Sequence, residues 1–116
     1  MWIGHVVLET DRLAETEQFM LKIGMRSVVQ RPEVAVLELR GGTHLVLTSR
    51  TGAIAGEAPF DLMVEDLEAT HQRFIELGLD PTPIGSASSN HRSFSVREPA
   101  GNIITFFSNH VSGQPV

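Results

Sequence analysis

Apolar and polar residues alternate along the chain with two different periods. In residues 10–25 and 64–79, apolar residues stand at i, i+7 and i+10, which places them on one face of a helix. Acidic and hydroxyl residues at the start of both stretches suit helix N-termini, and Gly24 and Gly78 suit left-handed C-terminal caps. The pattern predicts two amphipathic helices.

Short apolar runs on either side of these helices are typical of β-strands. Tight turns are expected at 40–42 and 98–101, where Gly101 supplies a position with positive φ. Each half of the chain therefore has the predicted order β-α-β-β-β. The strands are expected at residues 3–9, 26–31, 33–40 and 43–49 in the first half, and at 59–65, 80–85, 91–98 and 102–108 in the second.

The two halves also repeat one another residue by residue. The helical stretches align at a shift of 54 positions, and the last strands, which follow Gly42 and Gly101, align at a shift of 59. Caps, apolar stripe and stop glycine coincide in both copies, which favours an internal duplication. We expect one domain over residues 1–116, made of two repeats at about 1–50 and 58–110.

Composition narrows the class of protein. Hydrophobic residues make up 41% and charged residues 20% of the 116, as in an ordinary globular domain. The net charge is −5 without a basic cluster, and no apolar run reaches the roughly 18 residues of a membrane span, so neither nucleic acid nor membrane is an expected partner. The first residues carry no secretory signature, which favours the cytoplasm. The absence of cysteine excludes disulfides and thiolate metal sites.

Three stretches resemble the vicinal-oxygen-chelate superfamily, which includes glyoxalase I, bleomycin-resistance proteins and extradiol dioxygenases. They are "IGHVVLETDRLAETEQFMLKIGM", "FDLMVEDLEATHQRFIELGL" and "REPAGNIITFF". The last is similar to the family's Asp-Pro-Asp-Gly-Asn turn, with Glu98 and Ala100 in place of the aspartates. The resemblance implies an α+β fold, in which two β-α-β-β-β modules curl their mixed sheet into a cup with the helices on the outer face. It also implies a homodimer.

The same resemblance identifies four positions at which metal-dependent members hold their ligands. They correspond here to His5 and Pro59 on the first strands, and to Val46 and Thr105 on the last strands. Divalent transition metals need three or four imidazole or carboxylate ligands, and Pro59 and Val46 offer no donor atom. We therefore expect a degenerate metal site, with no metal ion and no other cofactor.

Strand alternation predicts which side chains face the cup, because residues two apart share one face of a strand. The residues expected to bind a ligand are His5, His44, Val46, Asp61, Met63, Thr105 and Phe107. An apolar surface with a few polar groups suits a small molecule, which favours a protein that binds or sequesters a ligand.

An enzyme is the alternative. A lyase, isomerase or dioxygenase could use a shifted metal centre of His5, His44 and Asp61, or His5 and Asp61 could act as a metal-free acid–base pair. A structural or regulatory domain with an empty cup is a third reading. Sequence alone does not assign catalytic residues or the identity of the ligand.

Overall fold

The structure, a computed structural model, describes residues 1–86 and 92–108. The first half contains β1 (His5–Thr10), α1 (Leu13–Lys22), β2 (Arg26–Gln30), β3 (Val34–Glu38), a short 3₁₀ turn (Arg40–Gly42) and β4 (His44–Ser49). The second half contains β5 (Glu57–Val64), α2 (Leu67–Glu76), β6 (Gly85–Ser86), β7 (Arg92–Arg97) and β8 (Ile103–Ser108).

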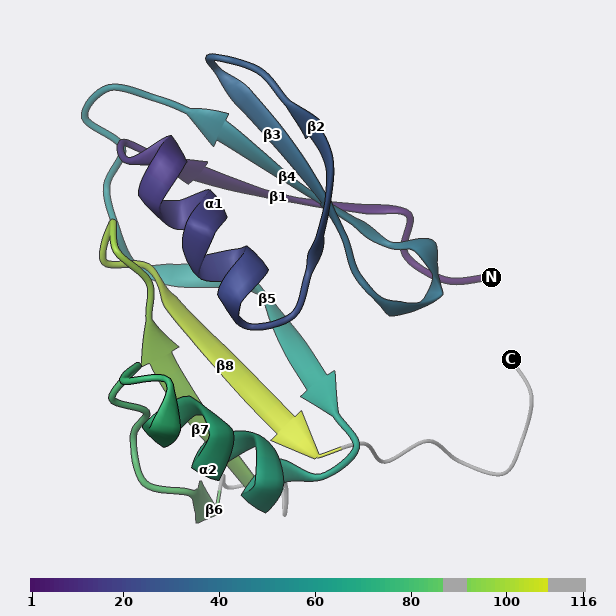
Figure 1. Ribbon diagram of the computed structural model, residues 1–116, viewed down its shortest axis with the longest axis vertical. Helices are drawn as coiled ribbons and strands as arrows, with labels where there is room; N and C mark the ends of the chain where they lie inside the picture. Colours follow the sequence, from purple (N-terminus) through teal and green to yellow (C-terminus); the bar gives the residue numbers. More distant parts are fainter. Residues whose placement is uncertain (87–91, 109–116) are drawn as a thin grey trace.

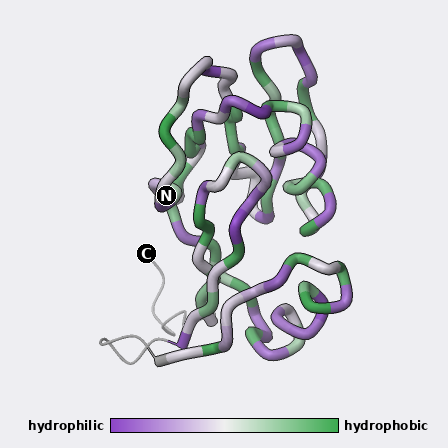
Figure 2. The backbone as a smooth tube through the Cα atoms, turned by 90° about the vertical axis from the view of Figure 1, so that its left-hand side faces the viewer, coloured by the Kyte–Doolittle hydropathy of each residue, from purple (hydrophilic) through white to green (hydrophobic). Residues whose placement is uncertain are grey.

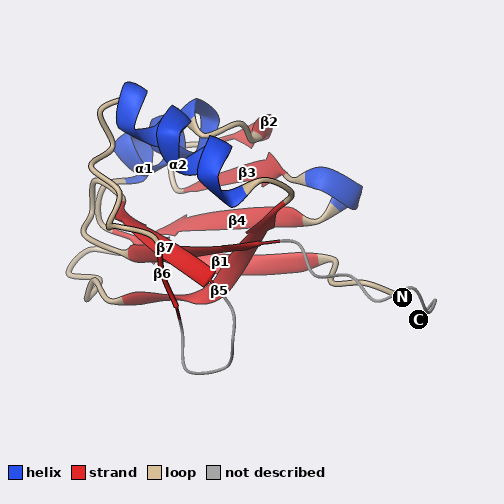
Figure 3. Cartoon of the chain, turned by 90° about the horizontal axis from the view of Figure 1, so that it is seen from below, coloured by secondary structure: helices blue, strands red, loops and turns tan. Residues whose placement is uncertain are grey.

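Each half forms its own four-stranded mixed sheet. The strand orders are β1-β4-β3-β2 and β5-β8-β7-β6, and the outer pairs β1–β4 and β5–β8 are parallel while the others are antiparallel. Both helices lie on the same side of the two sheets (Figures 1 and 3). The predicted α+β class and the paired β-α-β-β-β modules are thus confirmed. Within the described residues the sheets do not close into a barrel.

The internal repeat is visible in the residue ranges of the helices and strands. α2 begins and ends 54 positions after α1, and β8 begins and ends 59 positions after β4. The strand register follows the same two shifts, since Val7 pairs with Val46 in the first half and Asp61 pairs with Thr105 in the second. The change in shift from 54 to 59 therefore arises between α2 and β7.

The helices are shorter than the sequence pattern indicated, but their ends follow the expected chemistry. Asp66 caps α2 by accepting a hydrogen bond from the backbone N–H of Ala69 at 2.9 Å. α1 has no side-chain cap at Arg12, whose N–H instead donates to the hydroxyl of Thr10 at 3.0 Å. Positive φ values of 119° and 74° at Gly24 and Gly78 confirm the two glycine C-caps.

The core lies between the helices and the inner faces of the sheets. Apolar and polar stretches alternate along the chain in both halves (Figure 2), and more and less buried residues alternate along β1, β3, β4 and β5. Phe74 of α2 packs edge-on against Phe94 and Phe106, with ring centroids 5.7 and 5.1 Å apart. The largest fully buried apolar side chains are Met20, Leu37, Leu45, Leu47, Leu67, Phe74, Phe94 and Ile104.

The predicted strand over residues 80–85 is wrong in extent. Only Gly85 and Ser86 pair, as β6, against β7. Pro81 and Pro83 have no N–H to donate to a ladder, and Asp80 has a positive φ of 52° that breaks the extended chain.

In the described part of the chain, no helix is long and apolar enough to cross a membrane.

A buried hydrogen-bond network joins the two halves. Glu98, in the turn between β7 and β8, is 1% exposed. Its carboxylate accepts hydrogen bonds from the Thr16 hydroxyl at 2.7 Å, the Ala100 N–H at 3.0 Å, and the backbone and side-chain amides of Asn102 at 2.9 and 2.8 Å. The Thr16 hydroxyl also shares a hydrogen bond of 2.8 Å with Thr10. We call Thr10, Thr16 and Glu98 the Glu98 network.

The chain connection between the halves lies at the same end of the molecule. Gly56 donates to the side chain of Asn102 at 3.3 Å and accepts from the N–H of Ile103 at 2.9 Å. Gly101 has a φ of 97°, and a Cβ placed on it would come within 3.2 Å of the Cβ of Ala55. Glycine is therefore required at this contact, for both its φ and its missing side chain.

Replacing Glu98 by alanine should destabilise the protein by about 2–4 kcal/mol, because it removes the acceptor of the Thr16 hydroxyl, the Ala100 N–H and both amides of Asn102 from a buried network. Urea unfolding of Glu98→Ala measures this loss. Glu9→Ala is the matched control, since Glu9 is exposed and pairs with Arg50 at 3.1 Å on the surface; it should change stability by less than about 1 kcal/mol. Equal effects in both variants would contradict a central role for the Glu98 network.

Candidate functional site

The side of the sheets that faces away from the helices is the candidate site. In the first half, Val7, His44 and Val46 lie on this side of β1 and β4, while Leu45 and Leu47 between them are buried under α1. Within the described residues, both helices lie on the opposite side (Figure 3). We refer to this surface as the open face.

The second half extends the open face with a similar mixture of polar and apolar side chains. Asp61 pairs with Thr105 and Met63 pairs with Phe107 across β5 and β8. The Thr105 hydroxyl shares a hydrogen bond of 3.0 Å with the hydroxyl of Ser95 on β7. Met63 is 59% exposed, so an apolar side chain stands in solvent in the single chain. All seven residues selected from the sequence therefore lie on strands that build this surface.

The two histidines of the open face lie side by side. His5 and His44 are register partners on β1 and β4, with ring centroids 5.7 Å apart and planes at 67°. His44 Nε2 lies 3.7 Å from the carboxylate of Glu38, which in turn is 3.9 Å from Arg26. The carboxylate neighbour of the histidine pair is thus Glu38, which the sequence did not single out, rather than Asp61.

His5 and Asp61, which the sequence offers as an alternative acid–base pair, lie on different sheets. Within residues 1–86 and 92–108 no hydrogen bond or ion pair joins them. Asp61 is exposed, so its carboxylate is not desolvated in the single chain. Among the described residues, no three histidine, aspartate or glutamate side chains are placed to hold one metal ion.

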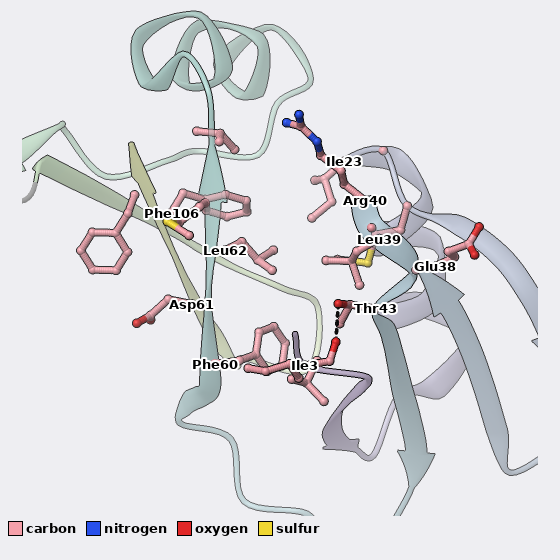
Figure 4. Close-up of a pocket in the computed structure, with 18 of the residues that line it drawn as sticks. Ile3, Ile23, Glu38, Leu39, Arg40, Thr43, Phe60, Asp61, Leu62 and Phe106 are labelled. Atoms are coloured by element: carbon pink, nitrogen blue, oxygen red, sulfur yellow. Dashed lines mark hydrogen bonds between the residues drawn. The ribbon is translucent and has the colours of Figure 1, made fainter. Parts of the chain in front are cut away.

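A concave region lies between the two halves. It is a groove of about 1260 Å³, and Asp61, Met63 and Phe107 border it, whereas the other four candidates lie outside its lining. From β5, Phe60 and Leu62 point into the groove, while Asp61 points to the other side of the strand (Figure 4). The sequence pattern assigned Phe60 and Leu62 to the helix side, where they would pass for ordinary core residues, so it gave no signal for a groove.

Charged residues surround the mouth of this groove. The Arg40 guanidinium bridges from the first half to Glu65 of the second at 2.5 Å. At the opposite end, the Thr43 hydroxyl donates to the backbone carbonyl of Ile3 at 2.6 Å and holds the chain that leads into β1 (Figure 4). The polar contacts therefore stand at the ends of the groove and the apolar side chains between them.

The helix side of the molecule carries a different set of polar contacts. His71 of α2 is partly buried: its Nε2 lies 2.8 Å from the carbonyl of Thr82, and its ring packs edge-on against Phe94. Glu68 accepts a hydrogen bond from Arg92, and this bond lowers the pKa of the Glu68 carboxyl below its ordinary value. These contacts join α2 to its own sheet and take no part in the open face.

Comparison with known proteins identifies other proteins that have this fold. No protein-family model matches the chain, and no curated protein sequence does. Among solved structures, a lactoylglutathione lyase from Agrobacterium tumefaciens superimposes with a TM-score of 0.82 at 20% identity, covering 97% of both chains. An integron cassette protein from the mobile metagenome of a Halifax Harbour sewage outfall gives a TM-score of 0.81 at 16% identity, covering 93% of this chain and 98% of the other.

A bleomycin-binding protein in complex with bleomycin also matches, with a TM-score of 0.75 at 13% identity over 95% of this chain and 99% of the other. The chain thus has the fold of the glyoxalase and bleomycin-resistance proteins of the vicinal-oxygen-chelate superfamily, as the sequence resemblance implied. At these identities the likeness establishes the fold and leaves the chemistry to the residues of this chain.

The donor set at the four superfamily positions leads to a prediction about metal content. Because Pro59 and Val46 cannot donate, protein purified without chelators or an affinity tag should carry well under one equivalent of zinc, iron, manganese, nickel or cobalt. Elemental analysis by mass spectrometry measures this content. Near-stoichiometric metal that disappears in His5→Ala would contradict the prediction and favour an enzyme with a non-standard centre.

Proposed function

We propose that this protein binds a small molecule on the open face of its sheets and does so without a metal ion. The observation that carries the proposal is the make-up of that face: apolar Val7, Val46 and Met63 stand beside polar His5 and Asp61, away from both helices. Apolar surface with a few polar groups is the usual composition of a small-molecule site.

Binding, rather than turnover, is the function these groups support best. A metal-free acid–base enzyme would need an acid and a base in reach of the same substrate atom. The nearest acid to the histidine pair is Glu38, which lies toward Arg26 at the edge of the sheet, while Asp61 belongs to the other half. Sequestration of the ligand, as in a resistance protein, needs only the shape and polarity of the face.

We propose further that two copies cover each other's open faces. Val7 and Met63 are exposed apolar residues on this face, and Trp2 and Ile3, which are also exposed, lie in the segment that leads into β1. A large apolar surface left in water is characteristic of an interface. In a dimer formed this way, the ligand would lie between the open face of one chain and that of its partner.

The dimer can be tested with two variants of equal exposure on opposite surfaces. Val7 on the open face and Ile75 on α2 are each 48% exposed. The wild-type protein should sediment at about twice the 12.7 kDa chain mass at micromolar concentration. Val7→Lys should shift it to the monomer, because a buried unpaired ammonium opposes association, while Ile75→Lys should remain dimeric. A wild-type monomer, or dissociation of both variants, would overturn the proposal.

Ligand binding can be tested by a thermal-shift screen of small molecules. Bleomycin is a suitable first probe because one structural neighbour binds it. A ligand at about 100 times its Kd adds about 2.7 kcal/mol to stability and so raises the Tm. Val46→Arg should abolish the shift by filling the open face with a charged side chain. Ile75→Arg, on the helix side, should leave it intact, and the same loss in both variants would place binding elsewhere.

A further inference from the structure

Three polar side chains form a row across the open face of the second half. Thr105 on β8 is the register partner of Asp61 on β5 and of Ser95 on β7. Phe94 and Phe106, which precede Ser95 and follow Thr105 in the sequence, are buried on the helix side. Because successive strand residues point to opposite faces, the three polar side chains point away from the helix. We call Asp61, Thr105 and Ser95 the polar row.

Hydrogen bonds fix the outer part of the polar row in the absence of a ligand. The hydroxyls of Ser95 and Thr105 share a hydrogen bond of 3.0 Å. Thr82 holds the backbone of Ser95, since its N–H donates to the Ser95 carbonyl at 2.9 Å and its hydroxyl accepts the Ser95 N–H at 2.8 Å. A ligand that contacts these hydroxyls therefore meets groups that are already ordered, which lowers the entropy lost on binding.

The internal repeat places an apolar row at the equivalent position of the first half. Val46 on β4 is the register partner of Val7 on β1 and of Val36 on β3. The shifts of 54 and 59 positions carry these three valines onto the three residues of the polar row. Since β1 and β5 contact each other, the two rows extend outward from neighbouring strands. Along this line, one half of the open face offers apolar contact and the other offers hydrogen bonds.

The polar row combines a group that only accepts hydrogen bonds with a group that can donate one. The carboxylate of Asp61 is an acceptor. Of the two hydroxyl hydrogens of Ser95 and Thr105, one is used in their mutual bond, and within the described residues the other has no protein acceptor. An ammonium group can only donate and a carboxylate can only accept, whereas an alcohol hydroxyl does both. Several hydroxyls on one ligand would satisfy the whole row.

Charge does not select the ligand on this part of the face. Glu57 and Arg97 are both register partners of Ile103 and have opposite charges, so this pair favours neither an anion nor a cation. The carboxylate of Asp61 is exposed, and an ion pair in water contributes little to affinity. A head group without net charge therefore matches the surroundings of the polar row.

We propose that the open face selects a ligand with a neutral polyhydroxylated head group, such as a sugar or a polyol, and an apolar body. The head group lies on the polar row, and the body lies on the row of valines. The inference rests on the function proposed above, because it names the class of ligand for the same face. Thr105, at one of the four superfamily ligand positions, becomes a residue that determines specificity through its hydroxyl.

The head group can be tested with probes that share one apolar chain. Isothermal titration calorimetry should compare octyl glucoside with 1-octanol, octyltrimethylammonium and octanoate, each below any micelle-forming concentration. Octyl glucoside should bind about threefold to tenfold tighter than 1-octanol, because its additional hydroxyls form hydrogen bonds with the polar row. It should also bind tighter than either charged probe.

Two variants locate the head group on the polar row. Thr105→Val keeps the shape of the side chain and removes its hydroxyl, and Asp61→Ala removes an exposed acceptor. Each should lower the affinity for octyl glucoside about threefold to tenfold and leave the affinity for 1-octanol unchanged. Thr51→Val is the matched control, since it removes an exposed hydroxyl from the turn after β4, and it should change neither affinity.

The outcomes separate this inference from the proposed function. Probe binding that is abolished by Val46→Arg but unaffected by Thr105→Val and Asp61→Ala would overturn the inference and leave the proposed function standing. Equal losses for octyl glucoside and 1-octanol, or a charged probe that binds as tightly as octyl glucoside, would also overturn the inference. If octyl glucoside does not bind, the inference is wrong, whereas the proposed function still depends on the wider screen. Binding that persists in Val46→Arg would contradict both.

Discussion

The carboxylate of Glu98 holds the two halves of the chain in one arrangement. It is buried in the last turn of the second half, yet it accepts the hydroxyl of Thr16 from the first helix. A buried carboxylate that keeps all its donors fixes the position of both partners, because any displacement would leave polar groups unpaired without water. Each sheet turns one side toward its own helix, and the other sides of the two sheets together form the open face.

The open face carries side chains that differ from those of the metal-dependent proteins that the sequence resembles. Superfamily enzymes place metal ligands where this chain has Val46 and Pro59, which have no donor atoms. The strand register nevertheless keeps these positions on the same surface, with His5 and His44 paired at one end. If the proposed function is right, this face keeps the strands of the fold and offers them to an apolar or weakly polar molecule.

Local patterns predicted most of the fold, because helix caps, turns and strand alternation depend on residues that are close together in the sequence. Gly24, Gly78 and Gly101 each adopt the positive φ expected of them. Contacts between distant residues were beyond reach: Glu98 and Thr16 are 82 positions apart, and the pairing of His44 with Glu38 depends on side-chain rotamers. The groove could not be predicted from the sequence, because apolar residues on the helix side of a strand have the same pattern whether they are buried or line a groove.

The placement of the Glu98 network at one end has a mechanical consequence. The chain connection at Gly56 and the Glu98 network together act as a joint, while the halves diverge at the groove beside Leu39. A small rotation about such a joint changes the width of the groove and, through the same rigid sheets, the angle between the two parts of the open face. A ligand that drew the two parts of the open face together would therefore also change the width of the groove, and by thermodynamic linkage the width of the groove would affect binding at that face.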